Sequence, residues 1–346
     1  METSGTVDMT ATTFNQLTSW AMCGMTLITF IEQTWLSKVN PHALGLKLTL
    51  VALMSLVAFC SVSCHRAHAA DWEALPVVPT LGPDVVAHLE RIADRGELAG
   101  NQPGVFAKIG DSITASPSFL QALACRRPRL GAWSELRGTF EFFGQTSLPR
   151  GSEAAQCEVS NSYSRLGVAA VPGWRAVDAL SRLEASPQCL ELPAVSCELQ
   201  QIHPSVALIM FGTNDLTDFT AVQFRRDLAR VARLASGAGT IPVISTIPPR
   251  QSQPYSRRVA RFNAEIAALA ENRALPVWNF WGQMVAPGVP NQGLGDDGVH
   301  PSAACPPCTA VDFRPAGLQQ GYALRNLGAL RVLDRLRRLI PLGDGQ

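Results

Sequence analysis

The sequence predicts an α/β fold in which helices cover both faces of a mostly parallel β-sheet. Short apolar runs typical of buried strands alternate with longer amphipathic segments typical of helices, and this alternation is characteristic of parallel sheets. Glycine-containing polar motifs directly follow two of the apolar runs, at Gly110 and Gly212. No internal repeat, Walker-type phosphate loop or dinucleotide fingerprint accompanies them.

The elements are expected in a regular order. A Pro-containing lead-in and a helix over about 84–95 precede a first strand at 104–109, and Ser112 opens the next helix. Further strands are expected at 166–171, 206–211, 241–245 and 276–280. The prediction is therefore a three-layer α/β/α domain with a mostly parallel, flavodoxin-like five-stranded sheet.

The remaining elements are read from their apolar periodicity. Two helices are marked by residues that recur every three or four positions: Phe224, Leu228, Val231 and Ala235 in one, and Val259, Phe262, Ile266 and Leu269 in the other. Thr139-Phe140-Glu141-Phe142-Phe143 is a candidate inserted strand. In the last helix, Leu327, Leu330, Leu333, Leu336 and Ile340 form an apolar stripe, while Arg331, Arg335 and Arg338 occupy another face. We expect that arginine face to be solvated rather than to bind an anionic partner.

The N-terminal region reads as an export signal. Lys47 precedes an apolar run over 48–59, and Ala67-His68-Ala69 supplies small residues at the two positions that a signal peptidase inspects. We therefore expect a leader over residues 1–69 with cleavage after Ala69, then a lead-in segment with a helix over 70–103, then one domain over 104–346.

Two alternatives to a cleaved leader remain. The apolar run is short of the ~20 residues that a membrane span requires, so an uncleaved anchor ranks second. A lipoprotein, with Cys60 or Cys64 as the lipidated residue, ranks third. Met22 and Met25 offer later starts, which leaves open whether the first ~40 residues belong to the natural protein.

The charge balance excludes one class of partner. The formal net charge is +1 and charged residues make up 16% of the chain. A nucleic-acid-binding protein normally carries a strongly basic patch, so we expect no nucleic-acid partner. We also expect no stable membrane span in the mature protein.

Cysteine usage agrees with export. After Ala69 the chain contains Cys125, Cys157, Cys189, Cys197, Cys305 and Cys308. An even number of cysteines in an oxidising compartment indicates disulfides, although the sequence does not choose among the connectivities. We expect the local pairs Cys189–Cys197 and Cys305–Cys308, which leaves Cys125 with Cys157. The alternatives for Cys305-Pro306-Pro307-Cys308 are a redox dithiol or half of a zinc site. The chain lacks a second Cys-x-x-Cys for a four-thiolate zinc site.

Three motifs lie where an active site is expected. Gly110-Asp111-Ser112-Ile113 follows the first strand, Gly212-Thr213-Asn214-Asp215 follows the 206–211 strand, and Asp297-Gly298-Val299-His300 precedes the last helix. Ligands of open α/β sheets bind beyond the carboxyl ends of the strands. The motifs therefore supply a nucleophile, Ser112, an oxyanion donor, Asn214, and a base, His300, to one crevice. Asp215 and Asp296 are expected to be structural turn residues.

The histidine positions support His300 as the base. If the leader is removed, only His88, His203 and His300 remain. A strand separates His203 from Asn214 by about 25–30 Å at ~3.3 Å per residue, which places His203 at the opposite rim of the sheet. His88 lies in the amphipathic helix before the first strand and reads as a structural residue. An imidazole suits the role of base because its pKa lies close to neutral pH.

On these motifs the chain resembles the SGNH, or GDSL-type, hydrolase family over roughly residues 104–340. Gly110-Asp111-Ser112-Ile113 matches the first block of the family, with Ile in place of the commoner Leu, and the Asn214 and His300 motifs match later blocks. In the second block, Gly173 occupies the position of an oxyanion-hole glycine, although 166–174 lacks the Gly-x-Ser-Gly texture often found there.

The resemblance implies an SGNH hydrolase fold for residues 104–346 and a role for each residue. Ser112 is the expected nucleophile, His300 the base and Asp297 its orienting carboxylate. The expected oxyanion hole consists of the N–H groups of Ser112 and Gly173 and the side-chain amide of Asn214. The implied chemistry needs no metal and no organic cofactor.

The sequence therefore predicts a secreted or periplasmic serine esterase that acts on a small-molecule, lipid or glycan ester. An acyl (acetyl) transferase of the same fold, with a sugar hydroxyl as acceptor, would use the same residues. The opposing class is a non-catalytic carbohydrate- or envelope-binding module, because a fold alone does not establish activity.

Overall fold

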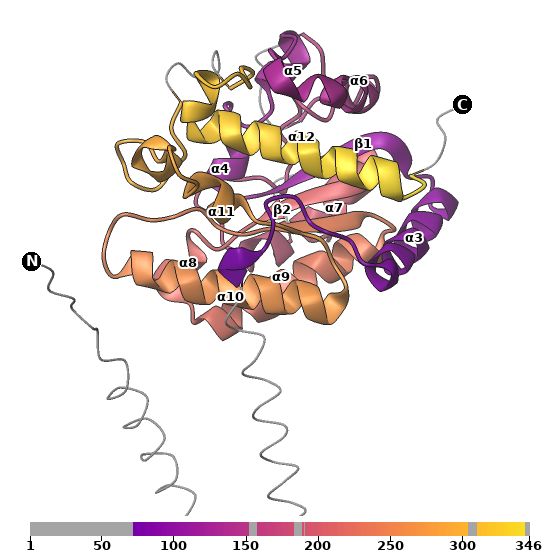
Figure 1. Cartoon of the computed structure of the whole chain (residues 1–346). Helices are drawn as coiled ribbons and strands as arrows, with labels where there is room; N and C mark the ends of the chain where they lie inside the picture. The colour runs from indigo at the N-terminus through magenta and orange to yellow at the C-terminus, as the bar shows by residue number, and fades with distance from the viewer. Residues whose placement is uncertain (1–71, 152–157, 183–188, 190, 304–309, 343–346) are drawn as a thin grey trace, which may run out of the picture. The chain divides into compact units, whose positions relative to one another are not determined.

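The sheet consists of parallel strands and confirms the predicted α/β class. A computed structural model describes residues 72–151, 158–182, 189, 191–303 and 310–342. In this part of the chain, strands β1 (Gln102–Gly110), β2 (Pro204–Met210), β3 (Ile241–Ser245) and β4 (Val277–Trp278) form one sheet in the order β1-β2-β3-β4 (Figure 1). All neighbouring strands are parallel. The predicted leader, residues 1–69, lies outside the described residues.

Burial on both faces explains why the strands read as continuous apolar runs. Every residue of β2 and of β3 is buried, as expected for a parallel sheet covered on both sides. Phe106 pairs with Val206 and Gly110 with Met210, so β1 and β2 end at the same edge. This shared edge carries the motifs that follow them.

Helices form a layer on each face of the sheet (Figure 1). On one face, α6 packs against β1 and α12, and α11 packs against α12; on the other, α7, α9 and α10 pack against one another and against β1 or β3. The α-helices are α3 (Pro83–Leu98), α4 (Ser112–Ala115), α5 (Ala122–Cys125), α6 (Arg137–Gly144), α7 (Ala194–Ile202), α8 (Asp215–Asp218), α9 (Ala221–Gly237), α10 (Tyr255–Arg273), α11 (Phe280–Met284) and α12 (Gly321–Leu339). Short 3₁₀ segments are Trp72–Ala74, Gly131–Leu136, Asp178–Leu180, Pro290–Gly293 and Gly317–Gln319. None of the described helices has the length and hydropathy that a bilayer span requires.

The expected strand at 166–171 is wrong as a regular strand. Its pairing with β1 is reduced to one parallel bridge between Gly110 and Ala170. The backbone turns there, because the N–H of Ala170 donates to the carbonyl of Gly167 (3.3 Å) and the N–H of Val168 donates to the Glu198 carboxylate (2.9 Å). The segment lies along the edge of β1 that is not paired with β2.

The candidate inserted strand at 139–143 is also wrong, because these residues lie in helix α6. Thr139 and Phe143 are one helical turn apart and both are buried. Phe143 packs edge-on against Phe106 of β1, with ring centroids 5.6 Å apart, and Thr139 donates a 2.6 Å hydrogen bond to Asp334 of α12. Tertiary contacts with the sheet and with α12 therefore override the β-propensity of this aromatic run.

The last expected strand, 276–280, is shorter than predicted. Its strand residues are Val277 and Trp278, and Asn279 then caps helix α11 by accepting a hydrogen bond from the N–H of Gly282 (2.9 Å). The same Asn279 side chain donates to the carbonyl of Leu75 (2.7 Å). The lead-in before α3 is thereby attached to the main core, and Trp72 extends this contact by packing against Trp281 at 4.8 Å.

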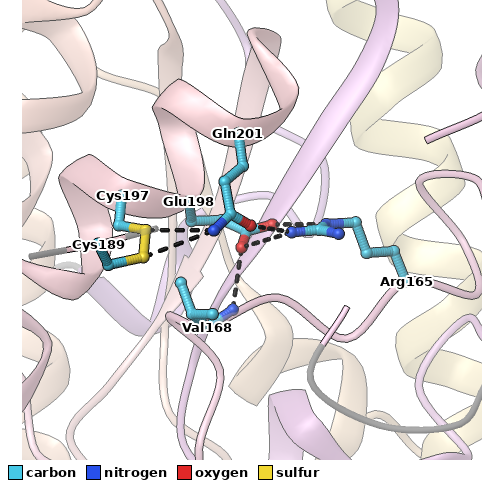
Figure 2. Close-up of a disulfide and its surroundings, with 6 residues drawn as sticks. All are labelled: Arg165, Val168, Cys189, Cys197, Glu198 and Gln201. Carbon is cyan, nitrogen blue, oxygen red and sulfur yellow. Dashed lines mark hydrogen bonds and ion pairs between the residues drawn. A yellow bond between two sulfur atoms is a disulfide. The ribbon is translucent and has the colours of Figure 1, made fainter. Parts of the chain in front are cut away.

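One of the expected disulfides lies within the described residues. Cys189 and Cys197 are bonded, with Cα atoms 5.3 Å apart, and Figure 2 shows this disulfide at the start of α7. Cys125 is disulfide-bonded as well. Cys157, Cys305 and Cys308 lie outside the described residues, so those pairings stay predictions.

Candidate active site

A tight turn at the end of β1 presents Ser112. A Cβ atom on Gly110 would lie 2.3 Å from the Thr114 hydroxyl and 2.5 Å from the carbonyl of Met210, so only glycine fits between the two strands there. Asp111 is fully buried and caps α4, because its carboxylate accepts a 3.0 Å hydrogen bond from the N–H of Ile113. Ser112 is consequently the first residue of α4 and lies at the sheet edge.

Ser112, His300 and Asp297 form one chain of hydrogen bonds. The Ser112 hydroxyl lies 2.8 Å from Nε2 of His300, and Nδ1 of His300 lies 2.5 Å from the Asp297 carboxylate. The other Asp297 oxygen accepts hydrogen bonds of 2.9 Å from the N–H groups of Val299 and His300. With the ring proton on Nδ1, Nε2 is left to accept the proton of the hydroxyl.

The environment of Asp297 favours its ionised form. Partial burial opposes ionisation, but the hydrogen bonds from the His300 ring and from the two backbone N–H groups outweigh it, and they hold the pKa of Asp297 below its usual value. A left-handed glycine, Gly298 (φ +64°), lets the chain turn sharply between Asp297 and His300. The motif therefore closes its hydrogen bonds within four residues.

Asn214 and Gly173 lie on two loops that are bonded to each other. Asn214 is the N-cap residue of α8 by position, and its side-chain amide makes no cap bond but donates a 2.9 Å hydrogen bond to the carbonyl of Trp174. Gly173, the preceding residue, has φ +81°, a conformation that glycine adopts without strain. Pro172 lines the same cleft as Ser112. The structure thus brings the two predicted donor loops into contact with one another.

Two buried carboxyl groups support these turns. Asp215 accepts a 3.0 Å hydrogen bond from the N–H of Ala176, and burial raises its pKa to about 7. Burial also raises the pKa of Asp111 to about 6. Asp215 is therefore a structural group behind Asn214, as its position in the motif predicts.

A cleft of about 840 Å³ opens beside the serine and the histidine. Besides Ser112 and Pro172, it is lined by residues 115–118 at the end of α4, by residues between 294 and 303 around His300, and by Gln320 and Tyr322 at the start of α12. Ser116, Ser302 and Gln320 contribute polar side chains. Burial raises the pKa of Tyr322 to about 12, so this wall carries a neutral phenol.

Arg325 fixes helix α4, which carries Ser112, and was missed by sequence reasoning. Its guanidinium is buried, donates to the carbonyl of Ile113 (2.5 Å) and to the Thr114 hydroxyl (3.0 Å), and lies 3.9 Å from the ring centroid of Phe119. Burial lowers its pKa to about 10. The available signal was the position of Arg325, two residues before the apolar stripe that begins at Leu327. The residues on both sides of Arg325 in α12 are buried.

The loop after β3 was also missed, and it contacts two of the motif loops. Arg250 donates to the carbonyl of Thr213 (2.8 Å), next to Asn214, and the N–H of Gln251 donates to the carbonyl of Gly298 (3.1 Å). This loop therefore contacts both the loop of Asn214 and the loop of His300, and it fixes their positions relative to each other. The sequence carries no motif for it, because both bonds use backbone carbonyls.

The other histidines lie elsewhere. His203 is the left-handed C-cap of α7 (φ +44°), directly before β2, and is therefore at the amino end of the strand whose far end leads to Asn214. His88 is part of α3. Among the described residues, no group of three or more His, Cys, Asp or Glu side chains has the arrangement of a metal site.

Comparison with known proteins identifies a family and similar folds. The sequence model of the GDSL-like Lipase/Acylhydrolase family matches residues 109–305. A search of curated proteins finds no significant match. A GDSL-like lipase from Bacteroides thetaiotaomicron is 14% identical, with 72% of this chain and 98% of that chain covered and a TM-score of 0.41. A lipase/acylhydrolase from Enterococcus faecalis is 20% identical (69% and 98%, TM-score 0.43), and an acetylxylan esterase from Geobacillus stearothermophilus is 14% identical (66% and 93%, TM-score 0.40).

Proposed function

The chain belongs to the GDSL-like lipase/acylhydrolase family, and from that premise we propose that it is a serine esterase with Ser112 as nucleophile, His300 as general base and Asp297 as its orienting carboxylate. The observation that carries the proposal is the hydrogen-bond chain of 2.8 Å and 2.5 Å that joins the three side chains. Nucleophile, base and orienting group within hydrogen-bond reach are the signature of an activated serine.

In the first half-reaction, Ser112 Oγ attacks the ester carbonyl carbon while His300 Nε2 takes the hydroxyl proton. The tetrahedral intermediate then collapses, the bond to the alcohol oxygen breaks, and His300 returns the proton to that oxygen. In the second half-reaction, water attacks the acyl group on Ser112 and gives its proton to His300, which returns it to Oγ. Asp297, held ionised by its hydrogen bonds, stabilises the imidazolium that forms twice.

The proposed oxyanion hole consists of the N–H groups of Ser112 and Gly173 and the side-chain amide of Asn214. The Asn214 amide carries two N–H donors, and its bond to the Trp174 carbonyl uses one of them. The second remains for the oxyanion. That bond also fixes the amide against the loop of Gly173, which supports the preorganisation that such a site needs.

The cleft supports an assignment of the two halves of the substrate. Because His300 must protonate the departing oxygen, the alcohol portion has to lie on the His300 side of Ser112. The cleft of about 840 Å³ extends on that side, between residues 115–118 and residues 294–303. We therefore place the alcohol portion of a small-molecule, lipid or glycan ester in this cleft.

An acyl transferase is the alternative within the same chemistry. If a sugar hydroxyl instead of water attacks the acyl group on Ser112, the same cleft would hold that acceptor, and its polar side chains, Ser116, Ser302 and Gln320, suit a hydroxyl-rich molecule. A non-catalytic glycan-binding module would retain the cleft but release no acyl group.

We also propose that the protein works outside the cytoplasm. The Cys189–Cys197 disulfide and the bonded Cys125 support this proposal, because disulfides persist in oxidising compartments. Thiol counting by mass spectrometry on protein from its natural compartment tests it, and fully reduced cysteines there would contradict it.

The decisive experiment follows acyl release from p-nitrophenyl esters of increasing chain length by the purified protein, together with a screen of acetylated glycans. We expect turnover of short-chain esters. A parallel assay with added sugar acceptors separates the two catalytic alternatives, since a transferase forms acylated sugar at the expense of free acid. Glycan binding without acyl release from any ester would establish the non-catalytic class.

A further inference from the structure

The segment 165–173, which ends at Gly173, is attached to the sheet by little backbone pairing. Its bonds to β1 are the N–H of Gly110 to the carbonyl of Ala169 (3.0 Å) and the N–H of Val171 to the carbonyl of Gly110 (3.1 Å). A regular edge strand would add further rungs on either side. The position of this segment therefore depends on other contacts.

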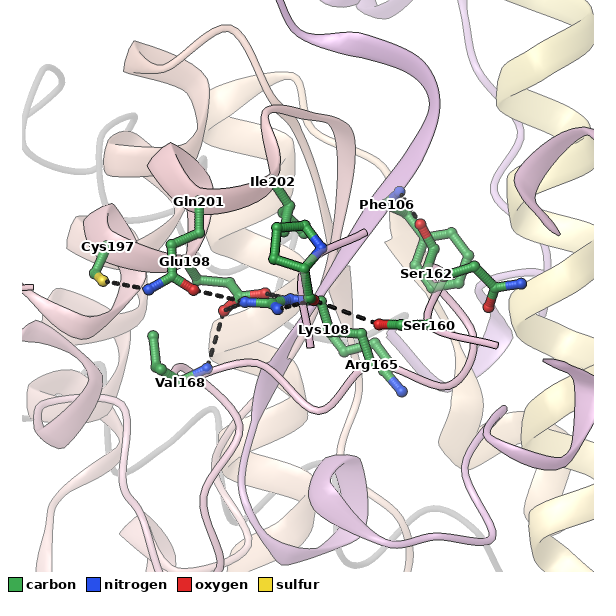
Figure 3. A network of polar contacts seen from close by, with 12 residues as sticks. Phe106, Lys108, Ser160, Ser162, Arg165, Val168, Cys197, Glu198, Gln201 and Ile202 are labelled. Carbon is green, nitrogen blue, oxygen red and sulfur yellow. Dashed lines mark hydrogen bonds and ion pairs between the residues drawn. The ribbon is translucent and has the colours of Figure 1, made fainter. Parts of the chain in front are cut away.

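Glu198 of α7 supplies one of those contacts. Its side chain is buried, and its carboxylate accepts a 2.9 Å hydrogen bond from the N–H of Val168 (Figure 3). The approach is close, because a Cβ atom on Gly167 would lie 2.2 Å from the carboxyl carbon of Glu198. The carboxylate thus occupies the space that a side chain at position 167 would need.

The same carboxylate also binds Arg165, the first residue of the segment. Nε of Arg165 lies 3.1 Å from one oxygen of Glu198 and Nη2 lies 3.2 Å from the other, and both side chains are only 2% exposed. A two-point contact of this kind fixes orientation as well as distance. Arg165 also donates to the carbonyl of Pro149. One buried carboxylate therefore binds the segment at residue 165 and again at residue 168.

Helix α7 is held in place close to Glu198 by a hydrogen bond of Gln201 and by a disulfide. Gln201 accepts a 2.6 Å hydrogen bond from Nη2 of Arg165, and its amide nitrogen lies 3.3 Å from Sγ of Cys197 and 3.5 Å from Sγ of Cys189 (Figure 2). The Cys189–Cys197 disulfide joins the chain before α7 to the first turn of the helix. The contact between Glu198 and the segment is thus supported on its far side.

Buried charge makes Glu198 hard to replace. Lys108 of β1 is also buried and donates a 2.7 Å hydrogen bond to the carbonyl of Tyr163. Burial lowers the pKa of Lys108 to about 7, and the Glu198 carboxylate opposes that shift. Without Glu198, the guanidinium of Arg165 would remain buried beside Lys108 with no carboxylate to balance it.

We propose that Glu198 is a positioning residue for catalysis: through Arg165 and Val168 it holds segment 165–173 so that the N–H of Gly173 points at the oxyanion. This inference rests on the proposed esterase function. The Arg165–Glu198 ion pair would then affect mainly the stability of the transition state, because oxyanion donors act on the charge that develops there.

The test compares Glu198→Gln with the unaltered protein on a matched ester and thionoester. Glutamine keeps the shape and can accept from Val168, but it removes the charge that fixes Arg165. We expect kcat for the ester to fall at least about 10-fold with little change in KM, less than the about 100- to 1000-fold loss of a whole donor. The thionoester places a weakly accepting sulfur at the oxyanion position, so its kcat should fall much less.

Two further variants keep the test decisive. Glu191→Gln makes the same substitution in the exposed ion pair of Arg182 and Glu191 and should leave both rates unchanged. If Glu198→Gln does not fold, Gln201→Ala, which removes a neutral contact to Arg165, should lower the ester-to-thionoester ratio in the same direction by a smaller factor.

The outcomes separate the two proposals. Equal losses on ester and thionoester, or no loss on either, in a folded variant would overturn the role of Glu198 while leaving the esterase intact. Absence of ester turnover by the unaltered protein would overturn the esterase proposal and, with it, this inference.

Discussion

Two chain segments reach the candidate site side by side, and they are held there by different means. The turn after β1 carries Ser112 and follows a strand that is paired with β2 from Phe106 to Gly110. Segment 165–173 carries Gly173, is paired with β1 at one bridge, and is fixed by the side chain of Glu198. The Ser112 turn is thus positioned by backbone pairing, whereas the neighbouring segment of Gly173 is positioned by buried side chains.

This difference predicts different responses to substitution. A strand in a sheet tolerates side-chain changes that keep its burial, because its hydrogen bonds come from the main chain. A segment held by a buried ion pair depends on single side chains, because removing one partner leaves the other charged and desolvated.

The largest effect is expected at Ser112, the proposed nucleophile. Ser112→Ala should lower kcat/KM for a p-nitrophenyl ester by at least about 10⁴-fold, because no other hydroxyl lies in the hydrogen-bond chain to His300 described above. The melting temperature should change little, since one half-buried hydroxyl is removed from α4. Calorimetry and ester hydrolysis on the same preparation check both parts. Residual turnover near that of the unaltered protein would remove Ser112 from the mechanism.

A smaller effect is expected where the two donor loops meet. Asn214→Ala removes the amide that bonds the Trp174 carbonyl and the donor proposed for the oxyanion. We expect kcat to fall about 100-fold or more with a smaller change in KM. Steady-state kinetics over a range of ester concentrations measure this split. An unchanged kcat would mean that Asn214 only ties its loop to the Gly173 turn.

A pair of glycine substitutions sharpens the comparison through stability. In Gly110→Ala the new methyl meets the Met210 carbonyl at 2.5 Å, so β1 and β2 must separate; in Gly167→Ala it meets the Glu198 carboxyl group. We expect Gly110→Ala to cost about 1–3 kcal/mol of unfolding free energy. Gly167→Ala should also destabilise the protein, because it displaces the buried carboxylate of Glu198, and it should in addition lower kcat of the folded protein. Gly237→Ala, at the last residue of α9, where no heavy atom lies within 4 Å, is the control.

Urea unfolding of the three glycine variants measures their unfolding free energies, and steady-state kinetics on the same proteins measure kcat. Equal stability losses and equal kcat losses at Gly110 and Gly167 would show that the two segments are held in the same way.

The smallest effect concerns Asp215, the buried carboxyl group next to Asn214. The pKa of Asp215 is raised from 3.8 to about 7 by burial, so between about pH 4 and pH 7 the native state holds a proton that the unfolded state has lost. The unfolding free energy of the unaltered protein should therefore fall as pH rises through this window. Asp215→Asn binds no proton in either state and should be relatively more stable at pH 8 than at pH 4.

Denaturant unfolding of both proteins at several pH values between 4 and 8 measures this difference. Asp111, whose pKa burial raises to about 6, contributes with the same sign in both proteins, and its charge adds to the raised pKa of Asp215. A stability difference that stays constant across the range would contradict the raised pKa of Asp215.

The regular part of the fold could be read from the sequence because its signals are local. Strands at 104–109, 206–211 and 241–245 were predicted within a few residues of β1, β2 and β3, since continuous apolar runs between turn signals are typical of buried parallel strands. The motifs at their ends could be placed at one sheet edge for the same reason.

The failures have a common physical cause. The run 139–143 is a helix because Phe143 and Thr139 find partners on β1 and α12, and 166–171 is a turn-containing edge because Val168 bonds to Glu198, thirty residues away. Neither partner is visible in the local pattern. Arg325 was missed for the same reason, because an arginine reads as a surface residue until its carbonyl partners are known.

The sequence by itself determined the family, the fold class and the motifs of Ser112, Asn214, Asp297 and His300, because strand periodicity and short motifs are properties of neighbouring residues. Only the tertiary structure decided how Ser112, His300 and the loops of Gly173 and Asn214 are held. The loop of Arg250 and Gln251, the buried Arg325, and the ion pair of Arg165 with Glu198 act across long sequence separations, and a buried charge finds its partner through the packing of helices on the sheet, which no local pattern records.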